Sequence, residues 1–425
     1  MEFKYGVDDW PPPGETLLFA AQWLALSVPT IVIIGKVLAV LHFTEPADQV
    51  VYLQKLFFVA AVALLVQVLW GHRLPLLLGP ATVLLIGVTA SQGFALDTVY
   101  ASVFWGGAVL TLLSLTGLFG HVQRLFTPRI VAVVLLLIAF TLAPTIVRLV
   151  AAGPAPSPVS RLYFTLGLVA ATFTAHRVLA GVWRSTLIVW STAVGSVAYA
   201  LLFPGLEAGG ASTREPLVAG FLHHLTGTLE PHPAVLFSFL VCFLALAVND
   251  FGSIQSVTAL LRLPDPARRI SRGIAVTGLA NALSGLLGVV GPVDYSLSPG
   301  VLASTRCASR FTLLPTALAL FVLSVSPAAI GWVGAVPPVV VGGVLLYILG
   351  AQIATGLLVA FATEAPFSFD GGLVIGFSVL LGSVFSLLPP ATLDAMPVLL
   401  RPLLGNGFVV GVLAALALEH GIFRR

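Results

Sequence analysis

The residues best suited to chemistry form short polar groups inside apolar sequence. In LALAVNDFGSIQSV, which begins at Leu244, Asn249 and Asp250 stand side by side and Ser253 follows closely. The amide of Asn249 offers hydrogen-bond donors and an acceptor to a polar solute, and the carboxylate of Asp250 can carry a proton. An ionised carboxylate in the middle of a membrane span costs about 2.5–3.5 kcal/mol on insertion scales. This cost favours a functional site; the alternative is a carboxylate that caps a helix or pairs with a basic residue near the inner membrane face.

A second polar group lies in GPVDYSLSPG, which begins at Gly291. Glycine and proline interrupt the apolar sequence here, and the polar side chains could contact a solute or support the groups that do. One of them, Asp294, could instead lie in a watery vestibule. The candidates in this stretch are Asp294, Tyr295, Ser296 and Ser298.

Two further candidates lie in the first half of the chain. Gln22 stands in the first apolar run, where its amide could bind a ligand edge or tie two helices together, and both possibilities stay open. Thr82 belongs to PLLLGPATVLLIG, which begins at Pro75 and is interrupted by Gly and Pro like the stretch at Gly291.

The remaining polar residues indicate neither a metal site nor a cofactor. His223, His224 and His232 share a polar loop without ligand spacing, which favours a solvated loop. Cys242 and Cys307 lie in or beside apolar segments, where packing is their expected role. The sequence has no phosphate loop, nucleophile elbow or HExxH motif, so ATP-driven transport and common hydrolase chemistry lose support. We expect no cofactor and no enzymatic activity.

The composition is that of an integral membrane protein, in contact with membrane lipid. Of the 425 residues 58% are hydrophobic and only 9% are charged, with a mean hydropathy of +1.05, whereas soluble domains carry about 25% charged residues. The net charge of +3 is small and scattered, so we expect no nucleic-acid partner. The opening MEFKYGVDDWPPPG is polar and shows no cleavable signal.

The chain contains about fourteen windows of the length that a membrane span requires, which is about 20 apolar residues. The longest polar gap, residues 206–233, divides them into seven and seven and is expected to be an outer loop. With a cytoplasmic amino terminus, the inner loops collect most of the basic residues, as expected for the inner (plasma) membrane with both termini in the cytoplasm. The outer loops then keep only Arg148, Arg161, Arg214 and Arg401. The windows lie near 17–41, 52–71, 75–92, 98–119, 126–149, 161–176, 184–203, 234–262, 268–290, 293–309, 311–327, 333–361, 371–388 and 404–421.

The two halves resemble each other weakly, as in transporters built from repeats. HVQRLFTPRIVAVVLLLI, around Pro128, is similar to WVGAVPPVVVGGVLLYIL, around Pro338, and the third and tenth windows are both interrupted. Because seven is odd, the two halves must have opposite topology, so we predict an all-α polytopic fold with a 7+7 inverted repeat. An interrupted span leaves main-chain groups unpaired, which is tolerable only where they face protein or a polar cavity. The third and tenth segments therefore mark the expected site.

These motifs together resemble the nucleobase/ascorbate transporter family, which includes uracil and xanthine permeases. The resemblance spans nearly the whole chain in order and spacing. It is carried by YGVDDWPPPGETLLFAAQWLAL, LLGPATVLLIG, NDFGS, RRISRGIAVTGLANALSGLLG and SPGVLASTRCASR.

The resemblance implies a core domain, a gate domain and a substrate site between them. By analogy, residues 1–125 and 234–328 form the core and residues 126–205 and 329–425 form the gate. Short strands in the third and tenth segments meet between two half-helix ends, and the substrate binds there. Family members usually work as homodimers whose core moves against the gate, an elevator type of alternating access, and bacterial members commonly couple uptake to protons.

The sequence departs from the family pattern at two positions of the expected site. Where relatives usually carry a glutamate before the Phe-Gly step of the eighth segment, this chain has Asn249, and Asp250 follows it. Alignment on Gly300 places Leu297 where many relatives have a second acidic residue. Asn249 can still hydrogen-bond an imide or amide edge. Proton coupling, if retained, would fall first to Asp250 and next to Asp294; otherwise the protein is a facilitator or uses another ion.

The expected function is secondary active transport of a nucleobase such as uracil or xanthine, coupled to protons. The substrate-binding candidates are Thr82, Asn249, Ser253, Tyr295, Ser296, Leu297, Ser298 and Gln22. A sulfate- or dicarboxylate-type anion transporter on the same fold is the main alternative, because the half-helix N-termini carry partial positive charge. A membrane-embedded enzyme would require clustered acidic metal motifs, and the only DD pair, Asp8-Asp9, lies in the amino-terminal tail.

Overall fold

The computed structural model describes residues 3–151, 157–180, 183–184, 186–204, 216–295, 298–361, 368–397 and 400–423. Within these ranges the regular elements are helices except for two three-residue strands. The first half contains α1 (Pro13–His42), α2 (Pro46–Leu69), β1 (Leu78–Pro80), α3 (Thr82–Ala90), α4 (Leu96–Leu115), α5 (Phe119–Gln123), α6 (Pro128–Thr141), α7 (Ala143–Ala151), α8 (Pro158–Val178) and α10 (Leu187–Leu202). The second half contains α11 (Pro233–Leu260), α12 (Pro266–Leu287), β2 (Pro292–Asp294), α13 (Ser298–Thr305), η1 (Arg310–Thr312), α14 (Leu313–Ser324), α15 (Pro327–Gly334), α16 (Pro338–Phe361), α17 (Phe369–Ser386), α18 (Pro390–Asp394), α19 (Arg401–Leu404), α20 (Gly407–Ala417) and η2 (Leu418–Ile422).

Proline sets the start of many of these helices. It lacks the N–H that a first helical turn leaves unpaired, and its fixed φ suits that position. The long helices α1, α2, α6, α8, α11 and α12 all carry proline at the first or second position. The Pro-rich breaks of the sequence therefore locate the helix boundaries.

The membrane-spanning pattern agrees with the sequence prediction. Among the described residues, eight helices are long and apolar enough to cross a membrane, and a ninth span is possible if the bent pair Arg310–Ser324 and Pro327–Val333 is counted as one. Two shorter apolar helices, Leu187–Leu202 and Gly407–Ile422, add to these. Each of the predicted windows coincides with a helix, a helix pair or a strand followed by a helix.

The third and tenth segments are interrupted as predicted. Each consists of a short strand followed by a short helix, β1–α3 in the first half and β2–α13 in the second. The strands pair antiparallel, with Leu78 opposite Asp294 and Pro80 opposite Pro292. The Tyr295 N–H extends the ladder by donating to the Leu77 carbonyl at 2.7 Å. Pairing satisfies main-chain groups that would otherwise be unpaired at membrane depth, and the antiparallel direction agrees with an inverted repeat.

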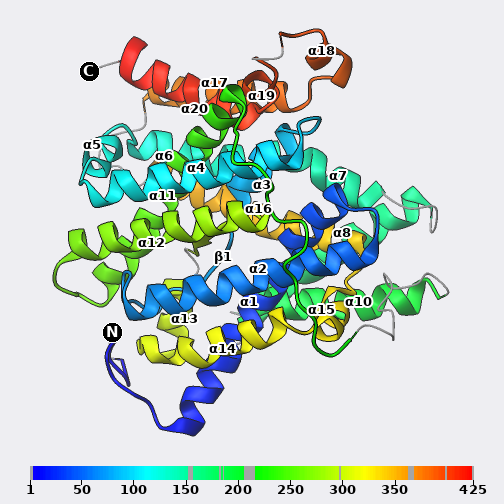
Figure 1. The fold of residues 1–425 in the computed structure, drawn as a ribbon, viewed down its shortest axis with the longest axis vertical. Coiled ribbons are helices and arrows are strands. Elements are labelled where there is room, and N and C mark those ends of the chain that lie inside the picture. The colour runs from blue at the N-terminus through cyan, green and yellow to red at the C-terminus, as the bar shows by residue number, and fades with distance from the viewer. Residues whose placement is uncertain are drawn as a thin grey trace.

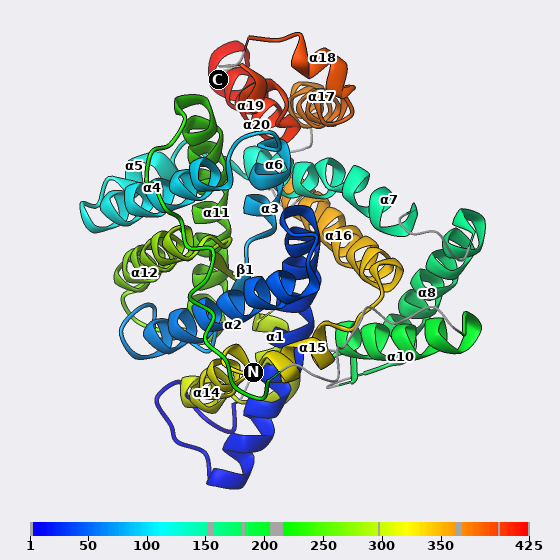
Figure 2. The same cartoon turned by 45° about the vertical axis from the view of Figure 1, so that its right-hand side comes forward.

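Glycines bring the helices beside these strands into close contact. α4 packs along α12, and a Cβ added to Gly107 would lie 2.6 Å from the Gly278 carbonyl oxygen. A Cβ on Gly285 would lie 2.4 Å from the main-chain nitrogen of Phe104. Small residues allow such backbone approach between membrane helices. In Figures 1 and 2, β1 lies near the middle of the molecule, with α4, α11 and α12 on one side and α7, α8 and α10 on the other.

Candidate functional site

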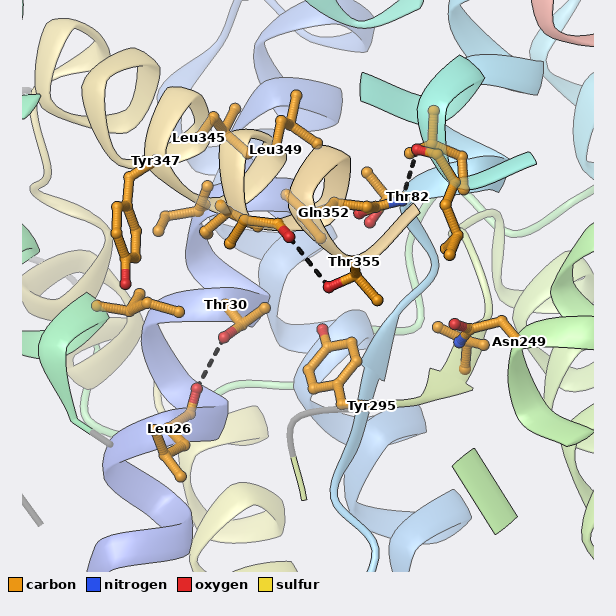
Figure 3. A pocket seen from close by; sticks show the side chains of 18 of the residues that line it. Leu26, Thr30, Thr82, Asn249, Tyr295, Leu345, Tyr347, Leu349, Gln352 and Thr355 are labelled. Atoms are coloured by element: carbon orange, nitrogen blue, oxygen red, sulfur yellow. Dashed lines mark hydrogen bonds between the residues drawn. The ribbon is translucent and has the colours of Figure 1, made fainter. Parts of the chain in front are cut away.

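A cavity of about 870 Å³ lies against the paired strands. Its walls come from α1, α3, α11, β2 and α13, and from α6, α8, α10 and α16. Most lining side chains are aliphatic, as is usual for a small-molecule site with few polar groups. Figure 3 shows α16 on the opposite side of the cavity from Tyr295, with Thr82 and Asn249 at one end. The polar lining residues are Thr30, Thr82, His176, Arg184, Asn249, Tyr295, Tyr347, Gln352 and Thr355.

Three of the predicted binding residues line this cavity. Thr82 is the first residue of α3, so the cavity lies at the amino-terminal end of that half-helix. Asn249 belongs to α11, and Tyr295 directly follows β2. The break in each repeat and the polar face of α11 therefore meet at one place.

One face of α11 holds the main chain of Asp294. Asn249 Nδ2 donates to the Asp294 carbonyl at 3.0 Å, and Ser253 Oγ donates to the same oxygen at 3.2 Å. The Asp294 N–H donates to Asp250 Oδ1 at 2.7 Å. Asn249 and Ser253 are four positions apart and therefore lie on the same helix face, and Asp250 binds the Asp294 N–H from the adjacent position. Asn249 is therefore both a cavity residue and part of the support of β2.

Asp250 and Asp294 lie one layer behind the cavity and do not line it. Both side chains are completely buried. In the part of the chain that the structure describes, Asp250 Oδ2 and both carboxylate oxygens of Asp294 have no hydrogen-bond partner. The imidazole of His72 also approaches this pair, with its Nε2 3.5 Å from Asp294 Oδ1. Among the described residues, Asp250 accepts the Asp294 main-chain N–H, and the Asp294 side chain is buried.

The other predicted residues lie away from the cavity or outside the described ranges. Ser298 Oγ donates to the Tyr295 carbonyl and accepts from the Leu77 N–H, both at 3.0 Å, so it supports the interrupted segments. Gln22 does not line the cavity, and its Nε2 is buried without a partner among the described residues. Ser296 and Leu297 lie outside the described residues.

Sequence reasoning missed the opposite wall of the cavity. Tyr347, Gln352 and Thr355 line it from α16. The Tyr347 hydroxyl lies 2.7 Å from His176 Nδ1, and an Arg184 guanidinium nitrogen lies 2.6 Å from His176 Nε2. An isolated glutamine in an apolar span, the signal used for Gln22, could have identified Gln352.

The residues that could indicate enzyme chemistry are bound to other protein groups or isolated. Asp8 pairs with Arg310 at 2.8 Å, and Asp9 accepts the Gly6 N–H at 2.7 Å. Within the described ranges, no group of three or more His, Cys, Asp or Glu side chains is placed to hold a metal ion.

Comparison with known proteins agrees with this architecture. Residues 14–391 match the model of the Permease family. The chain is 25% identical to the putative purine permease YwdJ of Bacillus subtilis, over 96% of each protein. It is 26% identical to the uric acid permease PucK of B. subtilis, over 89% of this chain and 88% of that protein. It is also 26% identical to the xanthine permease XanP of Escherichia coli, over 98% of this chain and 94% of that protein.

The fold is shared with a more distant solved structure. The transmembrane domain of the cyanobacterial bicarbonate transporter BicA matches with a TM-score of 0.65 at 14% identity, over 90% of this chain and 98% of that domain. At this identity the likeness concerns the fold alone. The family match covers most of the chain and includes both broken segments, so this protein belongs to the Permease family, the nucleobase/ascorbate transporter group that the sequence motifs resemble.

Proposed function

We propose that this permease imports a purine base such as xanthine or uric acid together with a proton. The observation that carries the proposal is the position of Asn249, which faces the cavity and is hydrogen-bonded to the strand that adjoins the two buried aspartates. The names of the three relatives support the purine part. The proton part of the proposal rests on the buried carboxyl groups of Asp250 and Asp294, which can take up and release a proton.

The cavity offers groups that suit a planar oxopurine. Such a base presents alternating N–H and C=O groups along its edge, and an amide such as Asn249 can pair with either. The amino-terminal end of α3 at Thr82 presents main-chain N–H groups, and the partial positive charge there favours a carbonyl oxygen or an anionic ring. Aliphatic side chains of α1 and α16 in the cavity wall would cover the ring faces. The base would thus be read at its edge by α11 and α3.

Proton coupling would be transmitted through the main chain of Asp294. Its carbonyl binds Asn249 and its N–H binds Asp250, so a shift of Asn249 toward a substrate changes the surroundings of both carboxyl groups. Since Asn249 cannot titrate, Asp250 is the first candidate for the coupling proton and Asp294 the second. This pair would take the place of the glutamate that the family resemblance implies at the position of Asn249.

The cavity also fits alternating access by movement of two domains. Its walls come from the proposed core, residues 1–125 and 234–328, and from the proposed gate, residues 126–205 and 329–425. Sliding of the core past the gate would expose the cavity on alternate membrane sides. We place this transport in the inner (plasma) membrane, with cytoplasmic termini and a homodimeric assembly.

Ligand-dependent thermal stability tests the substrate class. A ligand at 100 times its Kd stabilises a folded protein by about 2.7 kcal/mol. Purified protein in detergent is expected to melt at a higher temperature with xanthine or uric acid, and less so with uracil, adenine or ascorbate. Sulfate and a dicarboxylate serve as anion controls, and stabilisation by sulfate alone would overturn the purine assignment.

Substitution of Gly79 is expected to weaken purine binding without unfolding the protein. A Cβ at this position in β1 would lie 2.3 Å from the Tyr295 hydroxyl oxygen. In Gly79→Ala the Tyr295 side chain must therefore move within the cavity, and we expect affinity to fall about 10-fold, or about 1.4 kcal/mol. Gly252→Ala is the matched control, because no atom lies within 4 Å of a Cβ there. Equal affinities for the two variants, measured by titration calorimetry, would contradict the placement of Tyr295 in the site.

A further inference from the structure

A buried histidine outside the cavity is rigidly held beside the aspartate pair. His72 lies between α2 and β1 and is completely buried. Its main-chain N–H donates to Gln67 Oε1 at 3.3 Å, and its main-chain carbonyl accepts from Arg269 Nη1 at 2.9 Å. A Cβ on Gly273 of α12 would lie 3.1 Å from His72 Cβ, so α12 passes close to it. The backbone of His72 is therefore held from both α2 and α12.

The hydrogen bonds of the ring determine its tautomer. The Leu74 main-chain N–H donates to His72 Nδ1 at 2.9 Å. A nitrogen that accepts a hydrogen bond carries no proton, so the one proton of a neutral imidazole is on Nε2. This Nε2 has no hydrogen-bond partner among the described residues and lies 3.5 Å from Asp294 Oδ1, which also lacks one. A donor and an acceptor therefore face each other slightly beyond hydrogen-bond distance.

The charged groups around this ring come from three elements. Asp294 of β2 faces Nε2, and Asp250 of α11 binds the main chain of Asp294. Arg269 of α12 directs Nη1 to the carbonyls of His72 and Arg73, not to the ring. α2 contributes the uncharged Gln67, whose Nε2 donates to Thr277 Oγ1 at 3.1 Å. The imidazole N–H is thus the group positioned to compensate charge on Asp294.

We propose that His72 is a positioning residue for proton coupling, a neutral Nε2–H donor that stabilises the carboxylate of Asp294 and does not itself carry the proton. When the Asp294 carboxyl gives its proton to water, its O–H bond breaks and the His72 N–H closes on the carboxylate. When the carboxyl is reprotonated, the contact lengthens again. No bond of the imidazole breaks, because the Leu74 N–H keeps Nδ1 occupied. This inference rests on the proposed proton coupling and concerns the Asp294 carboxyl group of the Asp250–Asp294 pair.

The tautomer can be measured without any transport. Purified protein with ¹⁵N-labelled histidine is compared with the His72→Gln variant, whose missing signals identify the His72 ring. We expect the ring to carry its proton on Nε2, because Nδ1 accepts the Leu74 N–H. A proton on Nδ1 would overturn the proposal.

Two variants separate positioning from proton carriage in proteoliposomes. Gln places an amide N–H near the position of Nε2 but cannot titrate, whereas His72→Leu removes the donor. Xanthine exchange without a gradient and xanthine uptake driven by a pH gradient are measured for both. We expect His72→Gln to retain both activities within about 3-fold, and His72→Leu to retain exchange but lose at least about 10-fold in driven uptake.

The alternative outcomes are distinct. Equal loss of driven uptake in both variants would show that the imidazole carries the proton, and full activity of both would show a purely structural role; either result overturns the proposal. Wild-type protein that exchanges xanthine without driven uptake would refute the coupling and the positioning role with it. A wild type that neither binds nor exchanges purines would refute the proposed function, while the NMR measurement would still decide the state of His72.

Discussion

Asp250→Asn is expected to abolish concentrative uptake while leaving the fold and purine exchange intact. The asparagine Oδ1 can still accept the Asp294 N–H that Asp250 binds at 2.7 Å, so the link between α11 and β2 is preserved. The side chain can no longer take up or release a proton. We therefore expect uptake against a gradient to fall at least about 10-fold, a change that corresponds to about 1.4 kcal/mol. Uptake into vesicles under an imposed pH gradient measures this.

A second aspartate provides the control for Asp250. Asp48 also accepts a hydrogen bond, from His224 Nε2 at 3.0 Å, but both side chains of this pair are partly exposed. Asp48→Asn is expected to transport as the wild type does. Wild-type accumulation by Asp250→Asn would remove Asp250 from coupling and leave Asp294 as the candidate.

Asn249→Leu is expected to cause the largest loss of purine affinity. The substitution keeps the approximate side-chain volume but removes the amide that lines the cavity and the 3.0 Å hydrogen bond to the Asp294 carbonyl. Loss of an edge contact leaves polar groups of the substrate unpaired in a desolvated site, which costs about 1–3 kcal/mol. We therefore expect a Kd increase of about 100-fold, measured by calorimetry.

A residue on the opposite cavity wall provides the comparison for Asn249. Gln352→Leu removes an amide from the same cavity, but the Gln352 side chain binds the Leu135 carbonyl of α6, at 3.5 Å, and has no link to β2. We expect a loss of affinity below about 10-fold. If Gln352→Leu is the more damaging change, the base is read mainly from α16 and the proposed role of Asn249 is wrong.

Helix positions and breaks could be predicted because their causes are local. Apolar windows bounded by proline predicted the segments that became α1, α2 and α11. Glycine next to proline at Gly79 and Gly291 predicted the interruptions, since such residues neither continue a helix nor pair their groups within it. Opposite topology followed from the odd number of segments in each half. These predictions are confirmed by the helix pattern, the antiparallel pair β1·β2 and the family match.

The site could be predicted only in part. Asn249, Asp250 and Asp294 stood out because polar side chains in apolar spans carry a desolvation cost that must be compensated. Nothing in their spacing shows that Asp294 would be bound through its main chain, or that Asn249 would reach the cavity while Asp250 would not. His72 and Tyr347 gave no signal, because their importance comes from neighbours far away in the chain.

The sequence by itself determined that this protein crosses the membrane many times, in two inverted halves, each with one broken span. Those properties follow from hydropathy and from the backbone chemistry of proline and glycine, which act over a few residues. The tertiary structure decided which polar groups share a cavity, which stay behind it, and which face each other without a bond. These relations depend on the packing of α11 against β2 and on α16 lying across the cavity from Tyr295, and side-chain packing between distant segments is set by the whole fold.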